Sequence, residues 1–247
     1  MNAHHTTSTY SEAFRIFLEH TDEKKVLLEA LTKHLQTLET ESLLDIGAGN
    51  GSLSIPLAKI IKHYIALEQK NDYEKLLRDA GLEVIHQSFP CEITKHFDAV
   101  VLSHALPPYF EGRESWESFV SAAWLCVNDT GHLLIITFED EDSEWSRLIK
   151  SSNLEIVKPQ QKRLKQLKKY LESFGMVEEE TITTYVRTKT LKEMVQALSF
   201  VWSDGKAEHI EIFLANKSIA EHLEKNYRTA TGYSFPFHHY LLDISQR

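Results

Sequence analysis

The segment Leu43-Leu44-Asp45-Ile46-Gly47-Ala48-Gly49-Asn50-Gly51 constrains the fold of this chain more than any other. A short apolar run leads into three glycines at alternate positions, and apolar residues at helical spacing follow. Because glycine has no Cβ, the backbone of such a strand–turn–helix unit can approach a ligand closely. The spacing is G-x-G-x-G, which differs from the G-x-G-x-x-G of dinucleotide enzymes, and no P-loop lysine follows it. The segment therefore predicts a ligand-binding turn in an α/β protein.

Short apolar runs rich in Val and Ile alternate with amphipathic segments along the next hundred residues. Strands are predicted at 43–46, 64–67, 82–86, 97–103 and 133–138, and helices at 55–61, 73–81 and 116–127. Such runs are typical of a parallel sheet that is buried on both faces. The alternation of strand and helix predicts the α/β class.

The two ends of the chain have a different pattern. Residues 1–40 have helical periodicity, with a break and a new N-cap at Thr21 or Asp22. Beyond residue 140 the pattern predicts a helix at 161–174, a strand at 178–187, a helical region at 191–227 and a last strand at 235–244. No linker separates these parts. We predict one domain, with a helical cap at 1–40, a core at 41–140 and a C-terminal part at 141–247.

Composition limits the partners of the chain. Its 247 residues are 42% hydrophobic, which is enough for a substantial core, and its formal net charge is −9. A field of this sign repels a phosphate backbone, so no nucleic-acid partner is expected. The basic run at 158–169 has the spacing of a solvated helix face, the alternative being a nucleic-acid patch.

Cysteine content and hydropathy point to a cytoplasmic protein. Cys91 and Cys126 have no CxxC spacing, and no apolar stretch approaches the roughly 20 residues that span a bilayer. The first ten residues are polar and do not form a secretory signal. The 13 histidines show no ligand spacing, so no metal is expected. We expect a monomer or weak dimer without membrane partners.

An acidic residue follows the predicted second strand. Glu68 lies 21 residues after Gly47, where a carboxylate can accept hydrogen bonds from both ribose hydroxyls of an adenosine group. A glycine turn alone, or a lone acid after a strand, is common in α/β proteins. The two features in this order predict a nucleoside cofactor.

The glycine segment from Asp45 to Gly51 resembles the first motif of class I S-adenosylmethionine-dependent methyltransferases, and Glu68 resembles their acidic second motif. Residues 97–103 and 131–138 resemble the motifs of the fourth and fifth strands. The resemblance implies a Rossmann-like, mostly parallel sheet of seven strands with an antiparallel last strand. It also implies that S-adenosylmethionine is the cofactor, and that its contacts are made by these residues: Asp45, Gly47, Gly49, Gly51, Glu68, Gln69, Gln87, Ser88 and Ser103.

The N-terminal segment from Tyr10 to Glu23 is similar to the corresponding region of the histamine N-methyltransferases, with the pattern Y-x-x-x-F-x-x-F-L-x-H-x-x-E. In that family the region caps the substrate. The resemblance implies that Glu23 binds the cationic end of an amine between Tyr10 and Phe14. The same residues also suit a helix that packs on a core, with Glu23 as an ordinary first-turn carboxylate. Phe17 is predicted to be core.

The segment after the fourth strand departs from that family. It reads Ser103-His104-Ala105-Leu106-Pro107-Pro108-Tyr109, with His104 where the family has a polar residue that contacts imidazole. His104 can orient a substrate or accept a proton, and it can also be a surface residue at a strand end. Tyr109 is a candidate for the pocket rim. The N/D-P-P-Y motif of nucleic-acid methyltransferases is absent, although the end of the segment echoes it.

The sequence therefore predicts a methyltransferase that acts on a small molecule. Methyl transfer depends mainly on aligning a nucleophile with the sulfonium carbon. The favoured acceptor is the nitrogen of a cationic amine that can bear an imidazole, with Glu23 and His104 as the catalytic candidates. Alternatives are an O-methyltransferase of a natural product, a protein side-chain methyltransferase, and a non-catalytic binding module that kept the fold.

Overall fold

The computed structural model describes residues 3–106, 113–138, 143–154, 163–203 and 206–246. Contacts divide the chain into two compact units. Unit 1 contains Met1–Glu23, Glu139–Pro159 and Thr183–His238, and unit 2 contains Lys24–Phe138, Gln160–Ile182 and His239–Arg247. No described helix is both long enough and apolar enough to cross a membrane. The prediction of a single domain stays a prediction.

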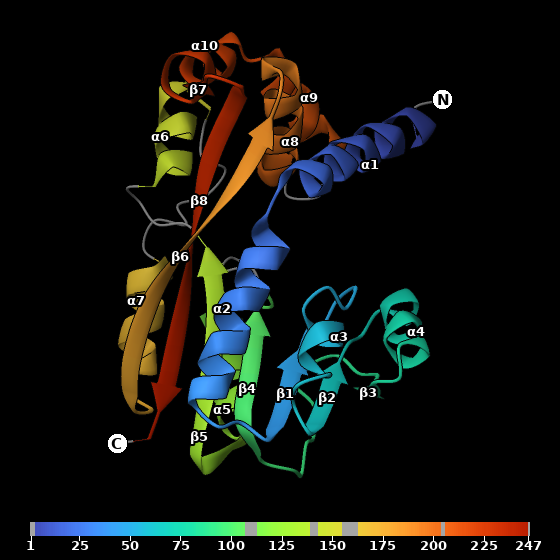
Figure 1. Cartoon of the computed structure of the whole chain (residues 1–247), viewed down its shortest axis with the longest axis vertical. Coiled ribbons are helices and arrows are strands. Elements are labelled where there is room, and N and C mark those ends of the chain that lie inside the picture. The colour runs from blue at the N-terminus through green and yellow to red at the C-terminus, as the bar shows by residue number, and fades with distance from the viewer. Residues whose placement is uncertain (1–2, 107–112, 139–142, 155–162, 204–205, 247) are drawn as a thin grey trace. The chain divides into compact units, whose positions relative to one another are not determined.

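The strands form one sheet in the order β3-β2-β1-β4-β5-β8-β6 (Figure 1). The pairs from β3 to β5 are parallel, whereas β8 runs antiparallel to β5. The strand bounds are β1 Ser42–Ile46, β2 His63–Leu67, β3 Glu83–Ile85, β4 Phe97–Ser103, β5 Val127–Phe138, β6 Met176–Thr188 and β8 Gly232–Ser245. An eighth, unpredicted strand, β7 (Arg228–Thr229), pairs only with β8. The predicted α/β class and the antiparallel last strand are confirmed.

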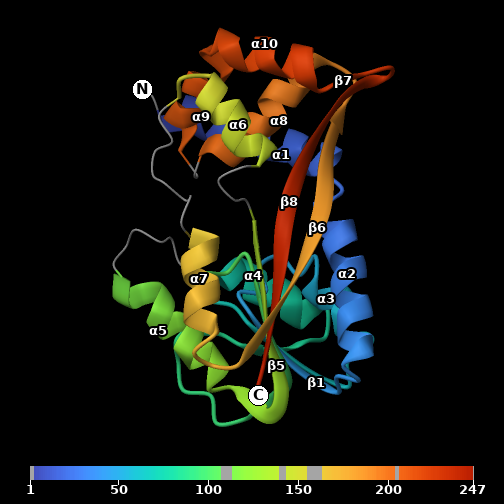
Figure 2. The ribbon, with the colours of Figure 1, turned by 90° about the vertical axis from the view of Figure 1, so that its left-hand side faces the viewer.

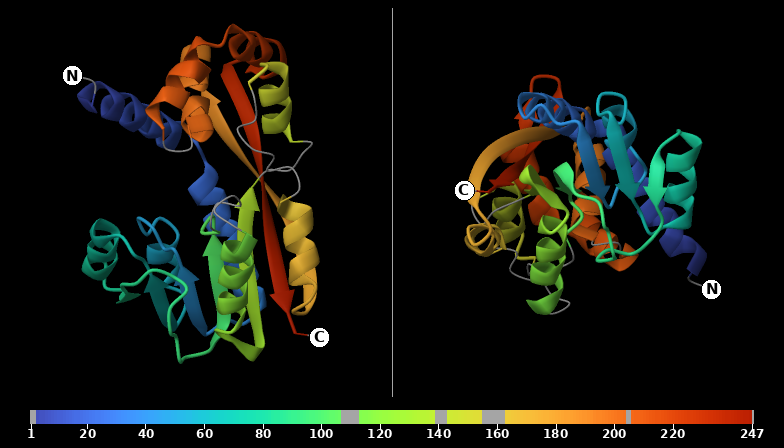
Figure 3. Two further views of the ribbon diagram at one scale, coloured as in Figure 1. Left: turned by 180° about the vertical axis from the view of Figure 1, so that it is seen from behind. Right: turned by 90° about the horizontal axis from the view of Figure 1, so that it is seen from below.

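Helices cover both faces of the sheet in unit 2 (Figure 2). On one face lie α2 (Glu23–Thr37), α3 (Ser54–Leu57) and α4 (Asn71–Asp79), whose buried leucines join inward residues of β1 and β4 in one core cluster. On the other face lie α5 (Arg113–Trp124) and α7 (Arg163–Leu171), which share a second cluster with β4 and β5 (Figure 3). Burial of both faces explains the continuous apolar runs of the strands.

The basic run at 158–169 falls partly in α7, where the structure describes it from residue 163. Leu164, Leu167 and Leu171 are buried, so the apolar side of the helix packs on the sheet. Lys168 forms an ion pair with Glu179 at 2.9 Å. The described part is an amphipathic helix with a solvated basic face, as the favoured interpretation has it.

Two predicted boundaries differ from the structure by several residues. The helix predicted at 55–61 ends at Leu57, after which the Lys59 and Ile60 N–H groups bond three residues back, with Ile60 donating to the Leu57 carbonyl at 3.0 Å. The fifth strand, predicted at 133–138, begins at Val127. There the Asn128 amide donates to Asp98 at 2.7 Å, and a register shift in the β4–β5 pairing accommodates the segment.

Unit 1 is mainly helical. Its helices are α1 (Ala3–His20), α6 (Glu144–Ser151), α8 (Leu191–Ser203), α9 (Ala207–Ala215) and α10 (Lys217–Asn226), of which α6 was not predicted. Trp145 of α6 packs against Phe213, Phe235 and Phe237 at centroid distances of 6.1, 6.3 and 5.7 Å. Phe235 and Phe237 are buried and belong to the core of this unit.

The junction between α1 and α2 is anchored to β6 within unit 1. Thr21 Oγ1 accepts a hydrogen bond from the Glu23 N–H at 3.2 Å, as expected of an N-cap at Thr21. Asp22 accepts from the Tyr185 N–H at 2.6 Å and pairs with Arg187 at 2.5 Å. The predicted break therefore also serves as an attachment point for β6.

Candidate active site

The glycine turn follows the carboxyl end of β1 and uses left-handed backbone at all three glycines. Gly47, Gly49 and Gly51 have φ values of 80°, 58° and 77°. A Cβ at Gly51 would lie 2.7 Å from Ile55, and one at Gly47 would lie 2.8 Å from the Ala105 Cβ. A Cβ at Gly49 would meet only the Gly47 carbonyl, at 3.9 Å, so it would project into open space above the turn. Neighbouring side chains thus block the Cβ positions of Gly47 and Gly51, whereas the open space at Gly49 leaves room for a ligand.

Asp45 supports this turn from below. Its carboxylate is buried and accepts hydrogen bonds from the Ser54 hydroxyl at 2.5 Å and the Tyr64 hydroxyl at 2.6 Å. Burial raises the pKa of Asp45 above its usual value, and burial also raises that of Tyr64. Ser54 follows the turn at the start of α3, so the network ties β1 to the helix. A direct contact between Asp45 and the cofactor stays a prediction.

Glu68 lies next to the turn. It is 5% exposed, and its Oε2 accepts from the Gly49 N–H at 2.8 Å while its Oε1 accepts from the Lys70 N–H at 2.8 Å. A carboxylate has about four lone-pair positions, so two bonds leave capacity for the two hydroxyls of a ribose. The structure thus joins the two predicted motifs through one hydrogen bond.

The predicted adenine contacts come from the segment after β3. Gln87 and Ser88 are exposed there, and the Ser88 hydroxyl donates to the Gln69 side chain at 2.8 Å. The Gln69 carbonyl also lies 3.0 Å from His86 Nε2. These contacts link the loop after β2, which follows Glu68, to the loop after β3. His86 was not predicted as a neighbour of this site, because the sequence pattern alone does not show which loops meet.

Ser103 ends β4, and its buried hydroxyl has no hydrogen-bond partner among the described residues. Buried polar atoms of this kind call for a partner, and a bound ligand can supply one. Together with the open space at Gly49 and the spare capacity of Glu68, this hydroxyl fits a nucleoside cofactor. The sequence-predicted cofactor residues therefore lie along the carboxyl edge of β1, β2, β3 and β4.

His104 follows Ser103 and has a left-handed backbone with φ 53°. Its N–H donates to the Ile136 carbonyl at 2.9 Å, and its side chain is exposed. Ala105, the next residue, is the one that a Cβ at Gly47 would strike. His104 is thus held beside the glycine turn. Tyr109, the predicted rim residue, lies outside the described residues.

The predicted amine-binding residues belong to unit 1. Phe14 packs on Phe200 with ring centroids 4.8 Å apart, and buried Phe17 packs on the same ring at 5.2 Å, which confirms Phe17 as core. Tyr10 lies in α1, but its side chain is outside the described part. Glu23 begins α2. The glycine turn and His104 belong to unit 2, so a site shared with Glu23 stays a prediction.

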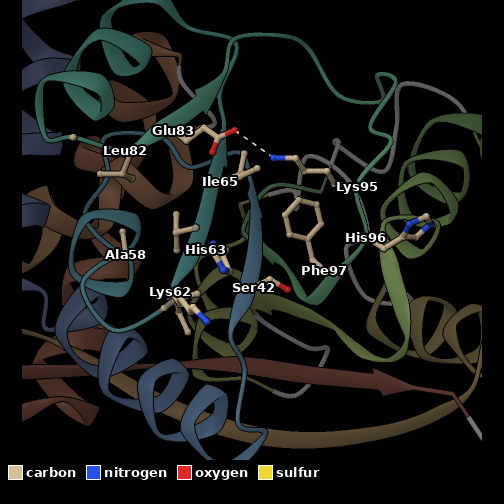
Figure 4. A pocket seen from close by; sticks show the side chains of 13 residues that line it. Ser42, Ala58, Lys62, His63, Ile65, Leu82, Glu83, Lys95, His96 and Phe97 are labelled. Carbon is tan, nitrogen blue, oxygen red and sulfur yellow. Dashed lines mark ion pairs between the residues drawn. The ribbon is translucent and has the colours of Figure 1, made fainter.

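A pocket of about 570 Å³ lies at the opposite edge of the sheet. Figure 4 shows that it is lined by Ser42, His63, Glu83 and Phe97, which begin β1 to β4. Lys95 pairs with Glu83 at 3.7 Å, and Lys62 pairs with Glu41 at 3.5 Å. Each lysine is thus compensated by its own carboxylate. No group of three or more His, Cys, Asp or Glu in the described residues could hold a metal ion.

Solved structures share this arrangement of sheet and helices. The YcgJ protein from Bacillus subtilis is 13% identical to this chain and has a TM-score of 0.58. The match covers 89% of this chain and 99% of YcgJ. A Bacillus halodurans protein assigned as a methyltransferase is 17% identical, covers 86% and 96% of the two chains, and has a TM-score of 0.56. This chain has the class I methyltransferase fold. The plantazolicin methyltransferase BpumL, solved with S-adenosylhomocysteine, is 11% identical, covers 99% and 91%, and has a TM-score of 0.51.

A sequence-family comparison points the same way. The family of ribosomal RNA adenine dimethylases matches residues 18–93, less than a third of the chain. This segment contains the glycine turn and Glu68 and ends before β4. The curated proteins contain no significant match. The methyltransferase-fold likeness thus covers most of the chain, whereas the family match covers β1 to β3 and all the predicted cofactor residues except Ser103.

Proposed function

We propose that this chain is an S-adenosylmethionine-dependent methyltransferase. The observation that carries the proposal is the hydrogen bond from the Gly49 N–H to Glu68 at 2.8 Å, beside a turn with open space above it. This geometry offers a carboxylate to the ribose and bare backbone to the rest of the cofactor. The fold and the family match over residues 18–93 support the same cofactor.

The cofactor supplies an activated methyl group on a sulfonium. The chain's part is to hold the acceptor in line with that carbon, to exclude water and to take the proton that the acceptor loses. A new bond forms between the acceptor heteroatom and the methyl carbon as the carbon–sulfur bond breaks, leaving S-adenosylhomocysteine. We assign the proton to His104, because this residue is exposed and the next residue, Ala105, adjoins Gly47 of the glycine turn.

For the acceptor, we propose a small molecule with a cationic amine, which can bear an imidazole. The support is the resemblance of residues 10–23 to the histamine N-methyltransferases, with Glu23 as the anchor and Tyr10 and Phe14 as walls. In this proposal Tyr109 lines the rim. An acceptor hydroxyl is the alternative, because His104 can also take a proton from a hydroxyl as its oxygen attacks.

RNA is a second candidate acceptor, favoured by one observation. The matching family is described as ribosomal RNA adenine dimethylases. Against it, the formal net charge is −9, and the matched segment ends before β4 and the segment that follows it, where His104 lies. A phosphate backbone would be repelled by this net charge.

One experiment tests these assignments together. Purified protein is incubated with methyl-labelled S-adenosylmethionine and a panel of biogenic amines, amino acids, phenols and unmodified ribosomal RNA. We expect labelled product from a small amine, and calorimetry is expected to show binding of S-adenosylhomocysteine. Absence of both binding and product across the panel would overturn the proposed function, whereas label in RNA would select the second candidate.

A substitution separates the amine from a neutral acceptor. Glu23→Gln removes the negative charge that anchors a cation, so KM for a cationic amine is expected to rise about tenfold or more while kcat changes less. A neutral phenol should keep its KM. Glu29→Gln, an exposed carboxylate in the same helix α2, is the control. An unchanged KM for the amine in Glu23→Gln would remove Glu23 from the substrate site.

A further inference from the structure

Three rings meet at the carboxyl ends of β4 and β5 in unit 2. The His104 ring lies 5.8 Å from Phe138 and 5.2 Å from His239, in edge-on arrangements of 73° and 70°. Phe138 and His239 are register partners in the β5–β8 pair, and their rings are 6.2 Å apart. We call these three residues the ring cluster. The proposed function uses His104, as the group that takes the proton, but neither of the other two rings.

The ring cluster adjoins the predicted cofactor site. Ser103, with its buried hydroxyl, precedes His104, and Ala105 after it abuts Gly47 of the glycine turn. The segment that carries His104 therefore contacts the turn through Ala105, and the strand pair β5–β8 through Ile136 and His239. A ligand on the turn would have the ring cluster as its neighbour within the same unit.

The members of the ring cluster differ in exposure. His239 is 2% exposed, Phe138 is half-buried and His104 is exposed. His104 also has a left-handed backbone, which is energetically unfavourable for a residue other than glycine. Such strained residues cluster at functional sites. A buried ring thus supports two rings that reach the surface.

We propose that His104 and Phe138 bind a planar aromatic or heteroaromatic ring of the methyl acceptor, with His239 as the positioning residue behind them. Aromatic rings prefer edge-to-face or offset contacts at centroid distances of 4.5–7 Å, and the exposed His104 with the half-buried Phe138 can offer such contacts to a ligand. This proposal rests on the proposed methyltransferase function and names the acceptor class. It holds for a ring-bearing amine and for a phenol alike.

Binding of simple ring compounds tests the proposal without knowledge of the acceptor. Saturation-transfer NMR on the full chain compares phenol and imidazole with cyclohexanol, a non-planar analogue of phenol, with and without S-adenosylhomocysteine. We expect stronger transfer to the planar probes than to cyclohexanol. Transfer to the planar probes should fall about threefold or more in His104→Asn and in Phe138→Leu. Asparagine is chosen at position 104 because it tolerates left-handed backbone.

Controls separate the ring cluster from general effects. His96→Ala removes an exposed histidine at the opposite edge of the sheet and should leave probe binding unchanged. Equal transfer to planar and non-planar probes, or transfer that His104→Asn does not reduce, overturns the proposal. Calorimetry with S-adenosylhomocysteine is read separately. Absence of S-adenosylhomocysteine binding would overturn the proposed function. The probe experiment without cofactor would still decide whether the ring cluster binds rings.

The role of His239 has its own readout. In protein labelled with ¹³C-histidine, the His104 ring signal is identified by its loss in His104→Asn. His239→Phe keeps a ring behind His104 and should preserve both this signal and probe binding, whereas His239→Leu should shift the signal and weaken probe binding. A signal and a probe affinity that are unchanged in His239→Leu would exclude a positioning role.

Discussion

The contact between Gly49 and Glu68 is the smallest feature on which the cofactor assignment depends. Glu68→Gln keeps the shape of the side chain and an oxygen for the Gly49 N–H but removes the negative charge. Because hydrogen bonds to charged groups are stronger than neutral ones, the Kd of S-adenosylhomocysteine should rise about tenfold or more. Calorimetry measures this change, and Glu92→Gln, an exposed residue of the loop before β4, is the control. An unchanged Kd would remove Glu68 from the cofactor site.

The open space above Gly49 gives a second prediction at the residue scale. Gly49→Ala places a Cβ in that space and strains a backbone at φ 58°, so affinity for S-adenosylhomocysteine should fall more than about tenfold. Gly81→Ala is the matched control, since Gly81 also has a left-handed φ, of 87°, with nothing within 4 Å of its Cβ position. Both variants should lose some thermal stability. Equal loss of affinity in both would show that strain alone is responsible.

At the scale of elements, a histidine–aspartate bridge joins α2 to β5 and β8. Asp243 lies 2.9 Å from His34 and 2.7 Å from His132, and its side chain is 9% exposed. The hydrogen bond between His34 and Asp243 raises the pKa of His34, and the nearby Glu180 and Glu178 act in the same direction. Burial raises the pKa of Asp243, but hydrogen bonds from His34 and His132 outweigh it and leave that pKa below its usual value.

These shifts set the sign of a pH dependence. The stabilisation from His34 is fully present below its ordinary pKa of 6.5 and is lost as pH rises through the raised value. The stabilisation from Asp243 is present above its ordinary pKa of 3.8 and is lost on further acidification. We therefore expect the bridge to contribute more to the free energy of unfolding near pH 6 than at about pH 9.

Asp243→Asn tests the bridge. It removes two charge-assisted hydrogen bonds and should lower the free energy of unfolding by about 1–3 kcal/mol near pH 6, with a smaller loss at about pH 9. Urea titration at the two pH values measures both losses. Asp129→Asn, an exposed aspartate in β5, is the control. A loss that does not depend on pH would show that the bridge is not charged in the native protein.

At the scale of the whole molecule, β6 and β8 each contribute residues to both units. Unfolding one unit would take residues of these strands out of the sheet, so we expect one cooperative thermal transition rather than two. Calorimetry should give equal van't Hoff and calorimetric enthalpies, and S-adenosylhomocysteine should shift the whole transition upward. Two resolved transitions, with only one shifted by the ligand, would contradict the predicted single domain.

The sequence by itself determined the α/β class, the parallel strands, the glycine turn and the position of Glu68. These features are local, because apolar periodicity and glycine placement depend on a few neighbouring residues. Because side chains alternate along a strand, the neighbours His238 and His239 in β8 must face opposite ways. Accordingly, His238 contacts Thr183 and Glu144, whereas His239 contacts His104.

Only the tertiary structure decided which distant residues meet. The sequence pattern did not show that His239 and Phe138 would join His104, because the pairing register of β5 with β8 connects residues a hundred positions apart. Nor did it show the bridge between His34, His132 and Asp243, or the burial of Asp45 by Ser54 and Tyr64. Such contacts depend on strand order and register, which no local pattern encodes.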